Sequence, residues 1–195
     1  QKTIPMLPEV LSNGVCSLQP EKNRYAKSVY ITYDDDANVV STRFANSLMR
    51  SSKRLTYVQA DKIIKGQKTD VQPEVISLLK NMETLAKMIE KRRREKGMIH
   101  LDIPEIEVIF DENGKLKGAM KAEDSYPHTI IEMFMVEANE AVARLFNSKN
   151  IPAMRRIHPR PDPLSMKNLS RLLKSFGFNF PEDPSHKDVQ DLLNK

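Results

Sequence analysis

The chain has 195 residues, of which 39% are hydrophobic and 29% are charged, a balance typical of a globular domain with a substantial core. This composition excludes collagen-like, mucin-like and wholly disordered chains, and no apolar run approaches the roughly 20 residues that cross a membrane. A single cysteine, Cys16, excludes an internal disulfide and a cysteine-cluster zinc site. The opening residues also lack the apolar segment of a secretory signal, so we expect a cytoplasmic protein without a membrane partner.

The charge balance is basic, with 31 Lys and Arg against 26 Asp and Glu and a net charge of +5. Such a balance suits an anionic partner such as nucleic acid, although it does not require one. Tryptophan is absent, and only 5 Tyr and 7 Phe are present, so any surface for base stacking is sparse. The chain starts at Gln1 without an initiator Met, and we expect it to be a piece of a longer protein.

The first half of the sequence predicts a hairpin followed by two helices. Residues 1–24 contain several prolines and predict an irregular loop with a short helical turn. Alternating β-rich residues around a polar turn at 34–38 predict a hairpin over 25–52. A short helix is expected over 54–66, and a long amphipathic helix over 73–97, where Pro opens it and Gly ends it.

The second half continues with another hairpin and another long helix. A strand is predicted over 99–111, with Pro104 at an edge or a bulge, then a turn at 112–115 and a returning strand over 116–123. A wide apolar stripe along 128–149 predicts a helix with one buried face.

The last part predicts a short strand, a proline-rich segment and two helices. The strand and the proline-rich segment occupy 151–163, the first helix 164–176, and the second helix the final residues from 188. Hairpins mixed with helices in this order predict an α+β fold.

The acidic run Asp34–Asp36 has the composition of a magnesium site, because hard cations prefer clustered carboxylates. However, three consecutive residues on a turn point in different directions, and no second group of aspartates lies nearby in the sequence. We therefore interpret this run as a solvated hairpin turn.

Two basic segments are candidates for RNA contacts, each with a simpler alternative. The run at 91–96 ends a helix, where positive charge complements the helix dipole, and it could equally contact an RNA backbone. Arg155 and Arg156 could bind phosphate, whereas His158 beside Pro159 is typical of a structural residue. Neither a nucleophile motif nor a glycine-rich phosphate loop is present, so the residues alone indicate a basic α+β domain with a candidate RNA surface.

Five segments carry a more specific pattern. They are IPMLPEVLSNGVCSLQPEKNRYA at 4–26, RLTYVQADKIIKG at 54–66, RREKGMIHLDIPEIEVIFD at 93–111, TIIEMFMVEANEAVARLF at 129–146 and IPAMRRIHPRPDP at 151–163. In order and spacing they resemble motifs of the catalytic (RNB) domain of the ribonuclease II/ribonuclease R family of 3′→5′ exoribonucleases. Among these motifs are IPMLP-x-x-LSN-x-x-CSL, R-L-T-Y and I-E-E-x-M-x-x-A-N. The resemblance implies a partial RNB-type fold over 1–195, with antiparallel hairpins packed against amphipathic helices.

The same resemblance implies that parts of the catalytic domain lie outside this chain. In the family, the metal-binding aspartates and an aromatic clamp residue precede the IPMLP segment, and a T-S-P-I-R-type arginine motif follows the last matching segment. Asp34–Asp36 cannot replace those aspartates, because they follow the IPMLP segment in a hairpin. We therefore expect the central part of the domain, with no metal ligands of its own.

Tyr57 and Glu132 occupy positions that have a role in the family. The resemblance implies that these two residues help to select RNA over DNA near the 3′ end. A phenol and a carboxylate can both hydrogen-bond a ribose 2′-OH, which DNA lacks. Their simpler interpretations are a tyrosine at a helix start and a solvated glutamate. Further candidates for contacts with the RNA backbone are Arg24, Arg155 and Arg156.

Two positions depart from the family pattern. The second acid of I-E-E is replaced by Met133, and Leu101 stands where the family often has a base-stacking Phe. Leucine can pack against a base but offers no aromatic face, so Leu101 is a weaker candidate for an RNA contact.

The resemblance implies the RNA-binding part of an enzyme that hydrolyses single-stranded RNA to nucleoside 5′-monophosphates. Mg²⁺ would serve the complete domain, and we expect this chain to be monomeric and inactive by itself. The first alternative is an RNB-fold protein that binds RNA without cleaving it. The second is a structural domain with no role in RNA binding. In that case, changes at Tyr57 and Glu132 would leave binding to RNA and to its DNA analogue equally unchanged.

Overall fold

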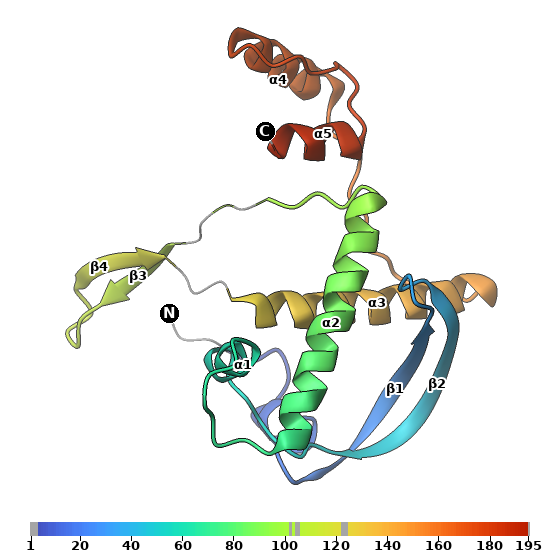
Figure 1. The fold of residues 1–195 in the computed structure, drawn as a ribbon, viewed down its shortest axis with the longest axis vertical. Helices are drawn as coiled ribbons and strands as arrows, with labels where there is room; N and C mark the ends of the chain where they lie inside the picture. Colours follow the sequence, from blue (N-terminus) through green and yellow to red (C-terminus); the bar gives the residue numbers. More distant parts are fainter. Residues whose placement is uncertain (1–3, 102, 104–105, 122–124, 195) are drawn as a thin grey trace. The chain divides into compact units, whose positions relative to one another are not determined.

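The computed structural model divides the chain into two units, each described here by itself. The first unit contains residues 1–88 and 125–149, and the second contains 89–124 and 150–195. Figure 1 traces the elements of both along the sequence. The residues that the structure describes are 4–101, 103, 106–121 and 125–194. Within them, no helix is both long and apolar enough to pass through a membrane.

The first unit begins with a π-helical turn, Val10–Val15, followed by a long antiparallel hairpin. Strand β1 (Asn23–Tyr33) pairs with β2 (Val39–Arg50), and a bulge interrupts the register beside Tyr33. The hairpin that the sequence predicts over 25–52 is confirmed, because alternating residues and a polar turn are local signals.

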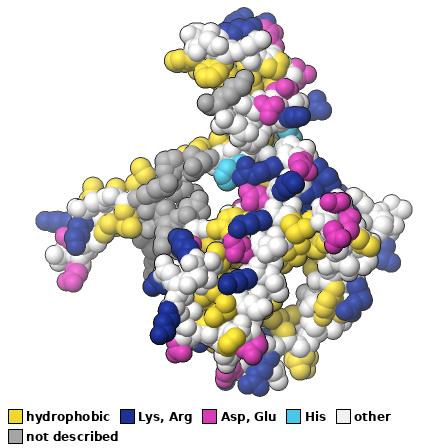
Figure 2. All heavy atoms as spheres, viewed as in Figure 1, with side chains coloured by type: hydrophobic (Ala, Val, Ile, Leu, Met, Phe, Trp, Pro, Cys, Tyr) yellow, Lys and Arg dark blue, Asp and Glu magenta, His cyan; other side chains and the backbone are white. Residues whose placement is uncertain are grey.

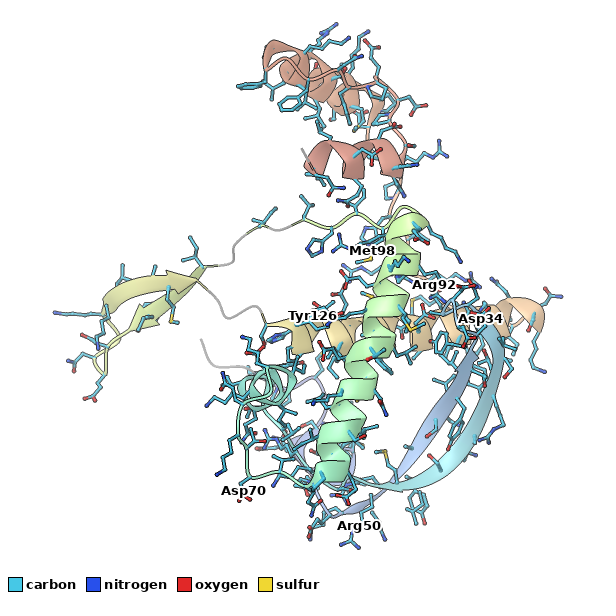
Figure 3. All side chains as sticks on the ribbon, in the orientation of Figure 1. Asp34, Arg50, Asp70, Arg92, Met98 and Tyr126 are labelled. Carbon is cyan, nitrogen blue, oxygen red and sulfur yellow. The ribbon has the colours of Figure 1, made fainter. Side chains whose placement is uncertain are left out.

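Asp34 organises the turn at the tip of this hairpin (Figure 3). Its Oδ1 accepts hydrogen bonds from the backbone N–H groups of Asp36 at 3.0 Å and Asn38 at 2.7 Å. These bonds hold Ala37 in the left-handed region, at φ 58°, where a residue other than glycine needs such support. The acidic run is therefore part of a turn, as the sequence predicts.

Three helices complete the first unit. They are α1 (Tyr57–Ile64), the larger part of α2 (Pro73–Glu95) and α3 (Tyr126–Ser148). Each begins within a few residues of its predicted start, because capping residues and prolines mark helix starts locally.

Helix α3 provides the core of this unit. Its buried residues recur every three or four positions, and they are Pro127, Ile130, Met133, Glu137 and Ala141. This spacing places them on one face, which packs against α1 and β1. Residues of α3 outside this face are half-buried or exposed, and Glu132 is among the exposed ones.

The second unit contains a short hairpin and two helices. Strands β3 (Ile106–Phe110) and β4 (Leu116–Lys121) are antiparallel, and α4 (Pro163–Ser175) precedes α5 (His186–Leu193). The buried Ser170 Oγ donates to the carbonyl of Phe180 at 2.7 Å. The mixture of helices and antiparallel hairpins confirms the α+β class.

Two predicted strands differ from the structure. The strand expected over 99–111 begins only at Ile106, and the expected bulge at Pro104 lies outside the described residues. The strand expected within 151–163 is wrong, because 151–162 form no strand and are exposed throughout. Prolines at 152, 159 and 161 each remove a backbone donor, which disfavours pairing there.

Candidate functional site

Tyr57 is the first residue of α1, and a complete capping box fixes the backbone at this point. Thr56 Oγ1 accepts from the backbone N–H of Gln59 at 3.2 Å, and Gln59 Oε1 accepts from the backbone N–H of Thr56 at 2.9 Å. These two bonds satisfy amide groups that a helix start otherwise leaves unpaired. The side chain of Tyr57 is 45% exposed, so it is accessible to a ligand.

The ring of Tyr57 stacks on the imidazole of His128, which lies in the first turn of α3. The ring centroids are 3.6 Å apart, and the planes are inclined by 22°. His128 Nδ1 lies 3.1 Å from the carbonyl oxygen of Ser125. Ser125 Oγ lies 3.4 Å from the same ring nitrogen, so Ser125 adjoins the imidazole with two polar atoms.

Glu132 lies one turn beyond His128 on α3 and is exposed. Residues four apart on a helix are neighbours, about 5–6 Å between their Cβ atoms. Through His128 the structure therefore brings Tyr57 and Glu132 into one region of the first unit. The next residue, Met133, is 1% exposed, so the position of the family's second acid faces the core.

His128 was not among the residues predicted from the sequence to contact RNA. Tyr57 and His128 come from different helices, and no spacing along the chain relates them. The only local signal is the position of His128 four residues before Glu132, on the same helical face.

Beside the stacked pair lies a cavity of about 420 Å³, lined by residues of α1, α2 and α3 of the first unit. Tyr57 contributes to its wall, together with apolar side chains such as Leu55, Leu79 and Ile131. On the face that Figure 2 shows, hydrophobic side chains reach the surface between Lys and Arg side chains. Lys53 also lines the cavity, and apolar walls with a positive charge are compatible with a nucleotide.

At the start of α3, Lys87 from α2 lies over the ring of Tyr126, with Nζ 5.3 Å from the ring centroid (Figure 3). This cation–π contact joins the two helices of the first unit near His128. It helps to hold the first turn of α3, where the imidazole is placed.

Arg24 on β1 has a network of hydrogen bonds within the protein. Its Nε donates to the carbonyl of Ser17 at 2.8 Å, and Nη2 donates to the carbonyl of Gly14 at 3.3 Å and to Gln19 Oε1 at 3.1 Å. The guanidinium group therefore ties the N-terminal loop to the hairpin. An RNA phosphate would compete with these acceptors, and the contact of Arg24 with RNA stays a prediction.

The other predicted contact residues belong to the second unit. Leu101 is 59% exposed, and Arg155 and Arg156 lie in the exposed segment before α4. The structure does not bring these three residues together with Tyr57 and Glu132 within one unit, so their contacts with RNA also stay predictions.

The basic run at the end of α2 includes an ion pair within the helix. Arg94 Nη2 lies 2.7 Å from Glu90 Oε1, four residues earlier. The helix ends at Glu95, and Gly97 in the turn beyond it has a φ of 96°, which favours glycine. This part of the run therefore supports the helix end, and a contact of the run with RNA stays a prediction.

The described residues do not fit a magnesium site. Nowhere in the part of the chain that the structure describes do three His, Cys, Asp or Glu residues gather to hold a metal ion. Asp34, the first residue of the acidic run, uses its carboxylate to hold the hairpin turn. No chemical step through a metal ion is assigned to these residues.

Comparison with known proteins relates this arrangement to one family. A family model described as the RNB domain matches residues 1–195. Ribonuclease R of Mycoplasmopsis pulmonis is 36% identical over 194 residues, which cover 98% of this chain and 27% of the relative. Ribonuclease R of Aquifex aeolicus is 36% identical over 196 residues, with 98% and 28% covered. The chain thus spans little more than a quarter of the length of these relatives.

Solved structures give the same result. The apo form of Mycoplasma genitalium RNase R matches with a TM-score of 0.88 and 29% identity, covering 97% of this chain and 30% of that chain. The same enzyme in complex with ribose methylated single-stranded RNA matches with a TM-score of 0.87, also at 29% identity and with the same coverage. Yeast Ssd1, described as a pseudonuclease, matches at 16% identity with a TM-score of 0.66, over 97% of this chain and 23% of that chain, which shows a likeness of fold alone.

Proposed function

Because the chain belongs to the RNB domain family, whose model matches residues 1–195, we propose that it is the central part of an exoribonuclease catalytic domain. The parent protein hydrolyses single-stranded RNA from its 3′ end and releases nucleoside 5′-monophosphates. This chain contributes the surface that recognises the sugar near the 3′ end. The proposal is supported by relatives named Ribonuclease R at 36% identity.

One observation carries the assignment of the sugar contact. Tyr57 and Glu132 are both exposed. His128 stacks on the ring of Tyr57 and lies one helical turn before Glu132, so it adjoins both residues. A ribose 2′-OH can accept a hydrogen bond from a phenol and donate one to a carboxylate. Deoxyribose can do neither, so this pair of side chains is suited to distinguish RNA from DNA.

The expected preference is moderate. Each hydrogen bond contributes about 1 kcal/mol, so two such bonds favour RNA over DNA by about 30-fold.

Mg²⁺ is part of the proposal for the parent protein. Hydrolysis of a phosphodiester commonly uses divalent cations. The described residues bring together no group of three His, Cys, Asp or Glu side chains for it, so the proposal places its ligands elsewhere in the parent. The role of this chain is to bind and orient RNA.

A second function is an RNB-fold protein that binds RNA without cleaving it. The fold does not separate it from the first function, because it is shared at 16% identity both with the Dss1 exoribonuclease and with a protein described as a pseudonuclease. Both functions use the same sugar contacts, and an assay of nuclease activity on the parent protein separates them.

Binding measurements on this chain test the sugar contact. Fluorescence anisotropy with a 5′-labelled oligoribonucleotide, and with DNA of the same sequence, gives an RNA-over-DNA affinity ratio. We expect Tyr57→Phe and Glu132→Gln each to lower this ratio about fivefold, because each removes one hydrogen bond. Glu140→Gln is the matched control, since Glu140 lies two turns further along α3 and pairs with Arg144 at the surface. Equal ratios in all four proteins would overturn the proposed contact.

We also propose that the protein is monomeric and cytoplasmic. The single cysteine, Cys16, is exposed and free, which suits a reducing compartment. Light scattering coupled to size-exclusion chromatography tests the monomer, and a mass twice that of the chain would contradict it.

A further inference from the structure

We infer that His128 is a positioning residue for sugar recognition, because its imidazole holds the ring of Tyr57 in place. His128 acts through Tyr57, so the preference for RNA depends on a side chain that has no sugar contact of its own. The inference rests on the proposed function and adds to it a residue that sets the specificity of the same site.

Tyr57 needs such a support because the capping box restrains its backbone but leaves its side chain free to rotate. The bonds between Thr56 and Gln59 fix the start of α1. A tyrosine that is 45% exposed can still turn between its staggered rotamers. The adjacent cavity of about 420 Å³, whose wall includes Tyr57, offers the ring a second place to lie.

The imidazole is itself held firmly enough to serve as a support. The carbonyl oxygen of Ser125 accepts a hydrogen bond of 2.9 Å from the backbone N–H of His128, and Nδ1 of the ring lies 3.1 Å from this oxygen and 3.4 Å from Ser125 Oγ. Pro127, in the first turn of α3, is buried and restricts the backbone just before His128. These contacts orient the ring plane as well as the backbone.

The contact is a close, nearly parallel overlap. The centroids are 3.6 Å apart and the planes differ by 22°, so the two rings lie face to face. Aromatic pairs more often have centroids about 4.5–7 Å apart, in offset or edge-to-face arrangements. Because His128 also lies one turn before Glu132, a single side chain adjoins both proposed sugar contacts.

A matched pair of substitutions isolates the stacking face. His128→Leu and His128→Phe both fill the site with an apolar side chain, and both lose the contact of Nδ1 with Ser125. Only His128→Phe retains an aromatic face. The two variants therefore differ in the stack and share the other consequences of removing histidine.

The RNA-over-DNA affinity ratio is measured for both variants, for Tyr57→Phe and for the double variant Tyr57→Phe with His128→Leu. We expect His128→Leu to lower the ratio about two- to tenfold, the range expected for losing one aromatic pair. His128→Phe restores most of that loss. The double variant has the same ratio as Tyr57→Phe alone, because both changes act through one phenol group.

A readout independent of RNA accompanies the binding data. In NMR spectra of the free chain, His128→Leu shifts the ring protons of Tyr57, since the ring current of the imidazole is removed. Glu140→Gln, which changes a distant residue of the same helix, leaves these protons and the ratio unchanged. Far-UV circular dichroism establishes that each variant is folded.

The outcomes separate the inference from the proposed function. If Tyr57→Phe lowers the ratio and His128→Leu does not, the positioning role is wrong and the proposed function stands. If His128→Leu and His128→Phe lower the ratio equally, the stack is not the cause and the inference is also overturned. If Tyr57→Phe leaves the ratio unchanged, the proposed sugar contact itself fails.

Discussion

The hydroxyl of Tyr33 on β1 donates a hydrogen bond of 3.1 Å to Glu137 Oε2 on α3, and so joins the long hairpin to the helix that carries Glu132. Glu137 is 1% exposed. A buried carboxylate is tolerated only when hydrogen bonds and charges satisfy it, so this contact contributes to the position of α3.

Removing the Tyr33 hydroxyl is therefore expected to destabilise the first unit. Tyr33→Phe should lower the free energy of unfolding by about 1 kcal/mol, because Glu137 loses one donor while buried. Urea unfolding followed by circular dichroism measures the change. Tyr25→Phe is the control on the same strand, since Tyr25 is 92% exposed and should leave stability unchanged. Equal stability of the two variants would contradict the role of the hydrogen bond.

The capping box at α1 is expected to matter both for stability and for Tyr57. Thr56→Ala removes the acceptor for the Gln59 amide and should destabilise the helix start by about 1 kcal/mol. Hydrogen exchange of the Gln59 amide should become faster, which NMR measures directly. Ser52→Ala, a change at an exposed loop residue, is the control. Unchanged exchange in Thr56→Ala would show that the cap does not hold this turn.

The hydrogen bonds at the start of α5 predict that the stability of the protein depends on pH. The Ser185 hydroxyl, and then the Ser185 backbone N–H, donate to Asp188 Oδ2 and lower the pKa of Asp188 below its ordinary value. Because the folded state favours the carboxylate, this contribution to stability is present above the unfolded pKa and is lost as the pH falls through the folded pKa.

NMR titration of the Asp188 carboxyl carbon checks this expectation. Ser185→Ala should raise the pKa of Asp188 toward its ordinary value, because it removes the strongest of the hydrogen bonds. Identical titration midpoints in the two proteins would exclude the hydroxyl as the cause.

The isolated chain is expected to bind RNA without shortening it. Within the residues that the structure describes, no group of three metal-binding side chains is formed. A 5′-labelled single-stranded RNA incubated with the chain and Mg²⁺ should therefore keep its length on a denaturing gel. Progressive shortening that EDTA abolishes would be evidence against this expectation.

Helices were predictable from the sequence because their signals are local. Thr56 and Pro73 stand at predicted helix starts, and α1 and α2 begin there. The last helix, predicted from residue 188, begins at His186. Strands were less predictable, because a strand requires a partner. The segment 151–162 resembles a strand in its first residues, yet it forms no strand in the structure.

The family, the α+β class and the two residues proposed to contact the sugar could be inferred from the sequence alone, since motifs and periodicities are properties of short segments. The folded structure was needed to show that His128 stacks on Tyr57 and that Arg24 ties a loop to the hairpin. It also shows that Glu137, on a helix with a solvated face, is buried. These relationships join residues from different elements, and they depend on how the elements pack.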